Sequence, residues 1–405
     1  MSERFGPFIL ERLLGRGGMA EAFIAQRRGA AGPRLVLKRI RADLADDAEY
    51  LRRFILEAQV ASRLGHDNLV RFHEFGRVGR CHYIAMDMVT GHSLNRLLDP
   101  VFADDRAPPV AAGLSIGTGL LDGLAAMHAV TDENGEPRPM LHRDVTPANV
   151  IISRDGVPVI IDFGITKDVL GPAITLPGRV IGTARYMAPE HRMAEYIDTR
   201  ADVFSVSVIL FELLTGTHPW PPLDSIKELL RTSFDPPVFP ASAVERLPED
   251  IRAVLLKGLA CAPQDRFADA AAMADALRAC TDYAALVDGG RQSVVEWVRS
   301  LDVTLDEELS APVVDLARRE PEEEVVMWTA GGNLSTDEVS AFDPTVDDHG
   351  VLTIPPLPPR RDAVLAMSGT EDLSLEALPG RPMWFWPAVL AVSAVAVWVV
   401  LSLFR

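Results

Sequence analysis

Residues 141–150 read LHRDVTPANV and place Asp144 five positions before Asn149. A second aspartate, Asp162, follows 18 residues after Asp144, at the end of an apolar run. Carboxylate and amide oxygens are the ligands that Mg²⁺ prefers, and this set would leave one carboxylate to orient a hydroxyl group. The three side chains therefore predict a site that handles phosphate groups together with magnesium.

A glycine-rich turn lies near the start of the chain, between two short runs that are typical of strands. Gly15, Gly17 and Gly18 follow the run 8–14 and precede the run 21–26. Because glycine has no Cβ, the backbone N–H groups of such a hairpin can approach phosphate oxygens. An ordinary glycine turn is the alternative, since the turn lacks the Gly-Lys-Ser/Thr of a P-loop and no helix of a dinucleotide-binding fold follows it.

Lys38 lies in an apolar, strand-like run, where its ammonium group must be solvated or paired. Glu57 lies in the next helical run, 51–64, and could reach back to Lys38. We predict this pair, which would hold the lysine against nucleotide phosphates. A surface position is the alternative for Glu57 taken alone.

With these residues in place, the chain resembles protein kinases, and specifically the Ser/Thr kinases. The resemblance rests on the His-Arg-Asp-x-x-x-x-Asn stretch, on Asp-Phe-Gly at 162–164 and on Met-Ala-Pro-Glu at 187–190, in the family's order and spacing. It covers residues 8–280 and implies an α+β, two-lobed fold, with a small β-rich N-lobe over about 8–90 and a larger helical C-lobe over about 91–280. The expected strands lie at 8–14, 21–26, 34–40, 70–76 and 82–88, and the expected helices at 51–64, 110–130, 203–215 and 249–260.

The resemblance implies a role for each of these side chains in phosphoryl transfer from ATP. Asp144 would be the catalytic base, and Asn149 and Asp162 would hold Mg²⁺. Lys38, paired to Glu57, would bind the α- and β-phosphates. The cofactors implied are therefore ATP and Mg²⁺, and the substrates are Ser/Thr hydroxyl groups of proteins.

The resemblance also implies an adenine site at the hinge between the lobes, where backbone groups of Asp87 and Val89 would bind the base with Met86 behind it. Glu190 and Arg266 are expected to form a buried structural ion pair. The complete set implied to contact ATP is Leu14, Gly15, Gly17, Gly18, Ala22, Val36, Lys38, Met86, Asp87, Val89 and Ile151.

The chain departs from the family pattern at several positions. Ala20 stands where a third loop glycine is usual, Ala22 replaces a valine, and Val36 replaces a smaller alanine. Thr146 replaces the lysine that would neutralise the moving phosphoryl group. We expect an active kinase, and the alternative is an ATP-binding pseudokinase that serves as a signalling scaffold. A small-molecule phosphotransferase is a third class, which the Ala-Pro-Glu segment and the long activation loop disfavour.

Arg143, directly before Asp144, is in this family the mark of control by phosphorylation of the activation loop. We expect Thr175 to be the phosphorylated residue and Thr183 to contact the substrate.

The charge of the chain is concentrated near its C-terminal end. The 405 residues hold 57 acidic and 40 basic side chains, for a net charge of −17, which argues against a nucleic-acid partner. Residues 301–383 contribute 18 of the acids and only five arginines. We interpret 281–383 as an acidic, Pro-containing linker. Phosphorylation of its Ser/Thr residues and recognition by a phosphothreonine-binding partner is one hypothesis, and a solvated spacer is the alternative.

Residues 384–404 read WFWPAVLAVSAVAVWVVLSLF and carry no charge. As a helix this segment would span roughly 31 Å, which matches a bilayer core. We predict a single-pass membrane helix with the kinase domain on the cytoplasmic side, and the alternative is a buried terminal helix. Tethering would favour self-association and autophosphorylation in trans.

Overall fold

The computed structural model describes residues 3–29, 32–104, 107–131, 135–162, 184–193, 195–220, 237–301, 303 and 325–329. All of these lie within one compact unit of the chain. Several predictions concern residues outside this set, namely Phe163, Gly164, Thr175, Thr183 and the membrane helix at 384–404.

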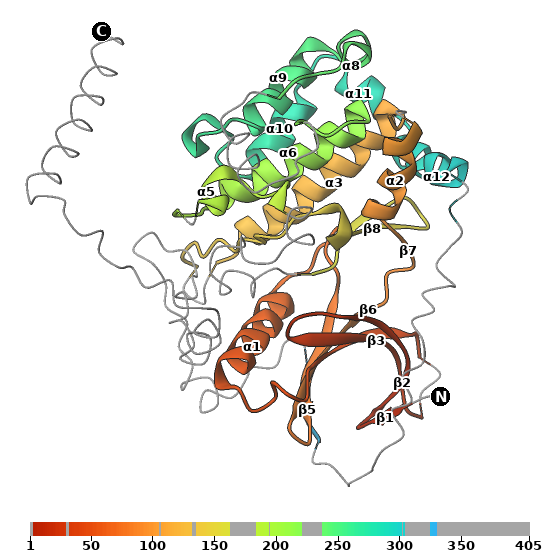
Figure 1. Cartoon of the computed structure of the whole chain (residues 1–405), viewed down its shortest axis with the longest axis vertical. Helices are drawn as coiled ribbons and strands as arrows, with labels where there is room; N and C mark the ends of the chain where they lie inside the picture. Colours follow the sequence, from red (N-terminus) through yellow and green to blue (C-terminus); the bar gives the residue numbers. More distant parts are fainter. Residues whose placement is uncertain are drawn as a thin grey trace, which may run out of the picture. The chain divides into compact units, whose positions relative to one another are not determined.

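The first lobe is built on one antiparallel sheet with strand order β1-β2-β3-β4-β6-β5-β10 (Figure 1). Its strands are β1 (Glu3–Phe5), β2 (Phe8–Arg16), β3 (Ala20–Arg27), β4 (Leu35–Ile40), β5 (Phe72–Val78), β6 (Cys81–Asp87) and β10 (Val325–Thr329). Successive side chains of a strand point to opposite faces. In β6, Tyr83 and Ala85 therefore join a cluster with Phe5 and Phe8, whereas Ile84 joins the core beneath helix α1.

Helix α1 (Ala48–Arg63) packs on this sheet next to β5. Its apolar residues follow the helical period, so that Phe54, Ala58 and Ala61 are buried. Phe54 meets Phe75 of β5 with ring centroids 6.4 Å apart. Glu57 lies one turn after Phe54 and is only 2% exposed, which places a carboxylate beneath the sheet.

The second lobe is helical and occupies the upper part of Figure 1. Its central helices α3 (Val110–His128) and α6 (Thr199–Thr215) approach closely, because a Cβ at Gly117 would lie 2.4 Å from Leu210. The other helices are α2 (Leu94–Asp104), α5 (Pro189–Arg192), α8 (Ala241–Arg246), α9 (Glu249–Gly258), α10 (Ala270–Arg278), α11 (Tyr283–Leu286) and α12 (Gly290–Ser300), with 3-10 turns η1 (Pro147–Asn149) and η3 (Pro263–Asp265). Among the described helices α3 alone is long and apolar enough to cross a membrane, but 61% of its apolar window is buried inside the protein, as expected of a core helix.

A small three-stranded sheet connects the catalytic segment to the helical lobe. It consists of β7 (Gly91–Ser93), β8 (Val150–Ser153) and β9 (Pro158–Ile160). A Cβ at Gly91 would lie 2.0 Å from the carbonyl oxygen of Ile152, so only glycine allows β7 to approach β8 this closely.

The two-lobed α+β prediction is confirmed, and the five expected N-lobe strands correspond to β2 to β6. The segment after residue 280 differs from its prediction. Composition placed 281–301 in the acidic linker, but the structure has α11 and α12 there, with Val294 and Trp297 buried. Composition also left 325–329 in the linker, and these residues form β10. These elements are formed by short apolar runs within a polar segment. The average composition of the whole segment does not show such runs.

Candidate active site

Lys38 joins the two lobes. Its Nζ lies 2.5 Å from Oε1 of Glu57 on α1 and 2.9 Å from Oδ1 of Asp162, which follows β9. The predicted pairing of Lys38 with Glu57 is thus confirmed. Lys38 is held by β4 between neighbours Ala22 on β3 and Ile84 on β6, so the strand fixes where its side chain begins.

Burial and neighbouring charges have opposite effects on the pKa values of Lys38 and Glu57. Burial disfavours the ammonium group, but Asp162 and Glu57 outweigh burial and raise the pKa of Lys38. Burial raises the pKa of Glu57, and Lys38 acts against that rise. Because the ammonium lies within hydrogen-bond distance of two carboxylates, we take Lys38 as charged and the pair as ionised. Lys38 is therefore held as an ammonium group between the carboxylates of Glu57 and Asp162.

Asp144 and Asn149 are joined across η1. Asn149 Nδ2 donates to the Asp144 carbonyl oxygen at 2.9 Å and also to Oδ2 of its carboxylate. Since the amide nitrogen faces Asp144, the amide oxygen of Asn149 faces away from it and is suited to bind a cation. The turn itself is closed by the bond from the Asn149 N–H to the Thr146 carbonyl oxygen at 3.0 Å.

The magnesium ligands predicted from the sequence fit these surroundings. Asn149 offers an amide oxygen, and Asp162 uses Oδ1 toward Lys38 and has a second carboxylate oxygen. Within the described residues no group of three His, Cys, Asp or Glu side chains could hold a metal by itself. A cation at Asn149 and Asp162 would therefore share its coordination with other oxygens, as Mg²⁺ does with substrate phosphates.

Asp202 on α6 fixes the backbone in front of Asp144. Its two carboxylate oxygens accept the N–H groups of His142 and Arg143, each at 2.8 Å, and Oδ2 also lies 3.1 Å from His128 Nε2. Arg143 has φ 63°, a left-handed conformation that costs energy for a residue with a Cβ. Two charge-assisted hydrogen bonds offset that cost. Burial opposes ionisation of Asp202, but its hydrogen bonds lower its pKa overall.

The glycine turn connects β2 to β3. The Gly17 N–H donates to the Ala20 carbonyl oxygen at 2.8 Å, and the register between β2 and β3 shifts at Leu14. A Cβ at Gly15 or Gly18 would meet no atom within 4 Å. These two glycine positions of the turn are therefore not packed against other described residues.

The residues expected to bind adenine come from both sheets. Val36 of β4 is paired with Met86 of β6, and Ile151 lies on β8. The Asp87 N–H donates to the Arg71 carbonyl oxygen at 2.9 Å, so Asp87 can offer adenine only its carbonyl oxygen.

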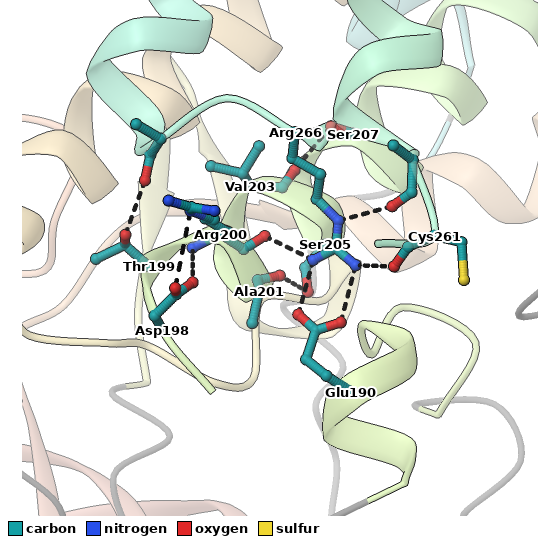
Figure 2. Close-up of polar contacts among 12 residues, drawn as sticks. Glu190, Asp198, Thr199, Arg200, Ala201, Val203, Ser205, Ser207, Cys261 and Arg266 are labelled. Atoms are coloured by element: carbon teal, nitrogen blue, oxygen red, sulfur yellow. Dashed lines mark hydrogen bonds and ion pairs between the residues drawn. The ribbon is translucent and has the colours of Figure 1, made fainter. Parts of the chain in front are cut away.

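Glu190 and Arg266 form the expected buried ion pair (Figure 2). Arg266 Nη1 and Nη2 bind the two oxygens of Glu190 at 2.7 and 2.8 Å. The other guanidinium hydrogen bonds go to the carbonyl oxygens of Ala260, Arg200 and Cys261. Arg266 also lies over the Phe204 ring, 4.9 Å from its centroid. The pair ties the segment that carries Glu190 to the base of the helical lobe.

Comparison with known proteins agrees with this geometry, because residues 8–277 match the protein kinase domain family. The chain belongs to the protein kinase family. Its kinase domain is 35% identical over 278 residues to the tyrosine-protein kinase MasK of Myxococcus xanthus, covering 67% of this chain and 43% of MasK. It is 33% identical over 271 residues to the serine/threonine-protein kinase PknH of Mycobacterium tuberculosis, covering 67% of this chain and 41% of PknH.

A solved structure is also similar. The PknI kinase domain of Mycobacterium tuberculosis is 30% identical, with a TM-score of 0.49, and the match covers 68% of this chain and 96% of that domain. The match to the curated relatives MasK and PknH spans about two fifths of their length.

Sequence reasoning missed two residues that shape the catalytic loop of this kinase. The sequence alone assigns no role to Asp202 or to His128. Asp202 binds the His142 and Arg143 N–H groups from about 60 residues away, and His128 acts on them only through Asp202, so spacing in the sequence gives no signal for these contacts. The available signal was an aspartate, Asp202, at the start of an apolar helix. If such a carboxylate is buried, it requires hydrogen-bond donors from other parts of the chain.

A second buried carboxylate of the kinase lies on α6 beneath the Ala-Pro-Glu segment. Glu212 is 1% exposed, and both its oxygens lie 3.0 Å from the Tyr186 hydroxyl oxygen, within hydrogen-bond distance. Burial raises the pKa of Glu212 to about 8 from its ordinary value of 4.5. Glu212 is therefore protonated in the folded kinase at pH values where the unfolded chain has released that proton.

Glu212→Gln is expected to weaken the dependence of stability on pH. The wild-type contribution is fully present below pH 4.5 and is lost as pH rises toward 8, because unfolding releases a proton throughout that window. Glutamine keeps the hydrogen bond and has no proton to release. The melting temperature should therefore fall less between pH 5.5 and pH 8 in the variant than in the wild type. Equal falls in both proteins would show that Glu212 ionises normally.

Proposed function

We propose that this chain transfers the γ-phosphoryl group of ATP to Ser/Thr hydroxyl groups of proteins, its own included. The observation that carries the proposal is Lys38 bound at once to Glu57 and Asp162, while Asp144 and Asn149 are joined across η1. This arrangement combines a fixed cation, two candidate magnesium ligands and a carboxylate. Such a site has positioning and charge stabilisation to offer, which is what phosphoryl transfer requires.

In the proposed mechanism Asp144 accepts the proton of the substrate hydroxyl as its oxygen attacks the γ-phosphorus. The bond from that phosphorus to the β–γ bridging oxygen breaks, and ADP leaves with the electron pair. Lys38 holds the α- and β-phosphates, and Glu57 keeps Lys38 in place. Mg²⁺ bound by Asn149 and Asp162 would neutralise phosphate charge. Asp202 acts only by positioning the backbone before Asp144.

The nucleotide would lie beneath the glycine turn, with Gly15, Gly17 and Gly18 over the phosphates. Adenine would lie between Ala22 and Val36 on one side and Ile151 on the other. The Asp87 carbonyl oxygen and the Val89 backbone would bind its edge, with Met86 behind it and Leu14 at the border.

Ser/Thr rather than Tyr specificity is part of the proposal, since relatives of both kinds match the chain. PknH is named a serine/threonine-protein kinase and MasK a tyrosine-protein kinase. The sequence around Asp144 resembles the Ser/Thr kinases apart from Thr146. The pseudokinase alternative rests on Thr146 alone, whereas the Lys38, Asp144, Asn149 and Asp162 side chains needed for transfer are all present.

Thr146→Lys is expected to raise the rate of phosphoryl transfer by about tenfold or more, because an ammonium group there would stabilise charge on the moving phosphoryl group. Thr146 is only 5% exposed, so the ammonium group of the new side chain must find a partner or reach solvent. Thr146→Met is the matched control, with similar length and no charge. A lysine variant no faster than the methionine variant would contradict this account of Thr146.

We also propose regulation by phosphorylation of the activation loop, because the family resemblance includes Arg143 directly before Asp144. Arg143 would bind phosphorylated Thr175, and Thr183 would contact the protein substrate. Phosphate mapped elsewhere on an active kinase, with Thr175 unmodified, would rule out Thr175.

We further propose that 384–404 anchors the chain in a membrane as a single span, with the kinase domain in the cytoplasm. The acid-rich segment between 301 and 383 would act as a tether, and tethering would favour self-association and trans-autophosphorylation. Phosphorylation of Ser335, Thr336 or Thr345 for a phosphothreonine-binding partner is the second use proposed for this tether. The charge of the chain argues against a nucleic-acid partner.

The test is incubation of the full chain with γ-labelled ATP and Mg²⁺, followed by identification of the labelled amino acids. Label on serine or threonine that is lost in Lys38→Ala supports the proposal. Label on tyrosine alone would refute the substrate class and leave the chemistry intact. Label that persists in Lys38→Ala would show that another kinase is responsible.

A further inference from the structure

The outer edge of the N-lobe sheet is covered by a segment from beyond the kinase domain. β10 pairs antiparallel with β5 over five residues, from Val325 opposite Val78 to Thr329 opposite Glu74 (Figure 1, blue). Without β10, β5 would be an edge strand whose outward N–H and C=O groups could accept another strand. The segment 325–329 therefore pairs with backbone N–H and C=O groups of β5 that the kinase domain alone would leave without a strand partner.

The β5–β6 hairpin shows which backbone groups face β10. Its strands are joined by the two residues Gly79 and Arg80, with φ 57° at Gly79, so Val78 and Cys81 next to the turn form a hydrogen-bonded pair. The bonding direction alternates along an antiparallel strand. The backbone groups of Arg77 and Phe75 consequently point away from β6, toward Val326 and Trp328 of β10.

The same part of the chain is anchored to the C-lobe by α12. Val294 and Trp297 of this helix are buried, and Arg291 Nε donates to the Asp155 carbonyl oxygen at 2.7 Å. Asp155 lies in the β8–β9 turn, next to Arg154, whose N–H donates to the Thr90 carbonyl oxygen at 3.1 Å. Thr90 belongs to the segment that joins the lobes, so α12 is held beside that connection.

The chain between the two anchors is long enough for both to belong to one molecule. From Leu301 to Val325 it has 24 residue steps, or roughly 80 Å when fully extended. A strand tethered in this way has an effective concentration on the order of millimolar, well above that of a second copy in dilute solution.

We propose that the outer edge of β5 is a strand-accepting site and that its occupant is residues 325–329 of the same molecule. The chain after the kinase domain then links the C-lobe, through α12, to the N-lobe, through β10.

The location connects the strand to the catalytic centre. β5 carries Phe75, which packs on Phe54 of α1, and α1 carries Glu57 bound to Lys38. Release of β10 would loosen the strand on which α1 rests. This consequence for Lys38 rests on the proposed function, whereas the strand pairing does not.

Backbone hydrogen exchange of the full chain in detergent tests the pairing independently of any catalytic activity. The amides of Phe75 and Arg77 should be protected in the wild type. Val326→Pro removes a donor that faces β5, and it should speed exchange of these two amides by about tenfold or more. Met327→Pro is the matched control, because the N–H of Met327 points away from β5 and the two amides should keep their protection.

Two results would overturn the proposal. Phe75 and Arg77 amides that exchange in the wild type as fast as those of the Gly79–Arg80 turn would show an open edge. Protection that disappears on dilution of the protein would show that the strand comes from a second copy. Amides of β3 and β4 serve as the internal control, since their unchanged protection shows that each proline variant is folded.

Discussion

Arg266→Ala is expected to lower the free energy of unfolding by about 3–5 kcal/mol, the typical cost of breaking a buried ion pair by removing one partner. The guanidinium group is fully buried. It donates two hydrogen bonds to Glu190 and further hydrogen bonds to three carbonyl oxygens. Its removal leaves the Glu190 carboxylate in a nearly water-free site with its strongest partner gone. It also removes the stacking on Phe204 and leaves a cavity.

Chemical denaturation of the wild type and the variant measures this effect. Arg278→Ala is the matched control, because Arg278 pairs with Asp122 at 2.7 Å but its side chain is 43% exposed. Exposed pairs contribute about 0–1 kcal/mol, so the control should remain close to the wild type. Equal losses in the two variants would contradict a structural role for the Glu190–Arg266 pair.

Asp144→Asn is expected to reduce phosphoryl transfer by about 10²–10⁴-fold, the usual contribution of a positioned general base. Asparagine has nearly the shape of aspartate, and its amide oxygen can still accept from Asn149. ATP binding should persist, because Lys38, Glu57 and Asp162 form their contacts without Asp144. Initial rates at saturating ATP, together with the dissociation constant of ATP, separate the two effects.

Asp122→Asn provides the control for this substitution. It makes the same chemical change at a half-exposed site on α3 and weakens only the pair with Arg278. Its transfer rate should equal that of the wild type. A comparable loss of rate in Asp122→Asn, or loss of ATP binding in Asp144→Asn, would argue against Asp144 as the base.

Much of the fold could be predicted because its signals are local. The N-lobe strands are short apolar runs separated by turn residues, and α1, α3, α6 and α9 carry apolar residues at the helical period. The family resemblance implies that Asp144, Asn149 and Asp162 lie close together. The structure joins Asn149 to Asp144 and places Asp162 beside Lys38. The Lys38–Glu57 pair followed from the need to neutralise a buried charge.

Other features depend on contacts between distant segments and have no local signal. Asp202 lies about 60 residues from the backbone groups that it binds, and the use of the Asp87 N–H by Arg71 appears only in the strand arrangement. β10 has only five residues in an acid-rich stretch, and its partner β5 lies about 250 residues earlier in the chain. α12 was not predicted because its residues were assigned to one linker with the acid-rich residues that follow.

The central claim is that Lys38, Glu57, Asp144, Asn149 and Asp162 form one phosphoryl-transfer site. The most direct test measures ATP binding and label transfer in the same samples of full-length wild type and Asp144→Asn. The account predicts that both proteins bind ATP in the presence of Mg²⁺ and that only the wild type transfers label at an appreciable rate. ATP binding without transfer in the wild type would contradict it and would leave the chain as a nucleotide-binding scaffold.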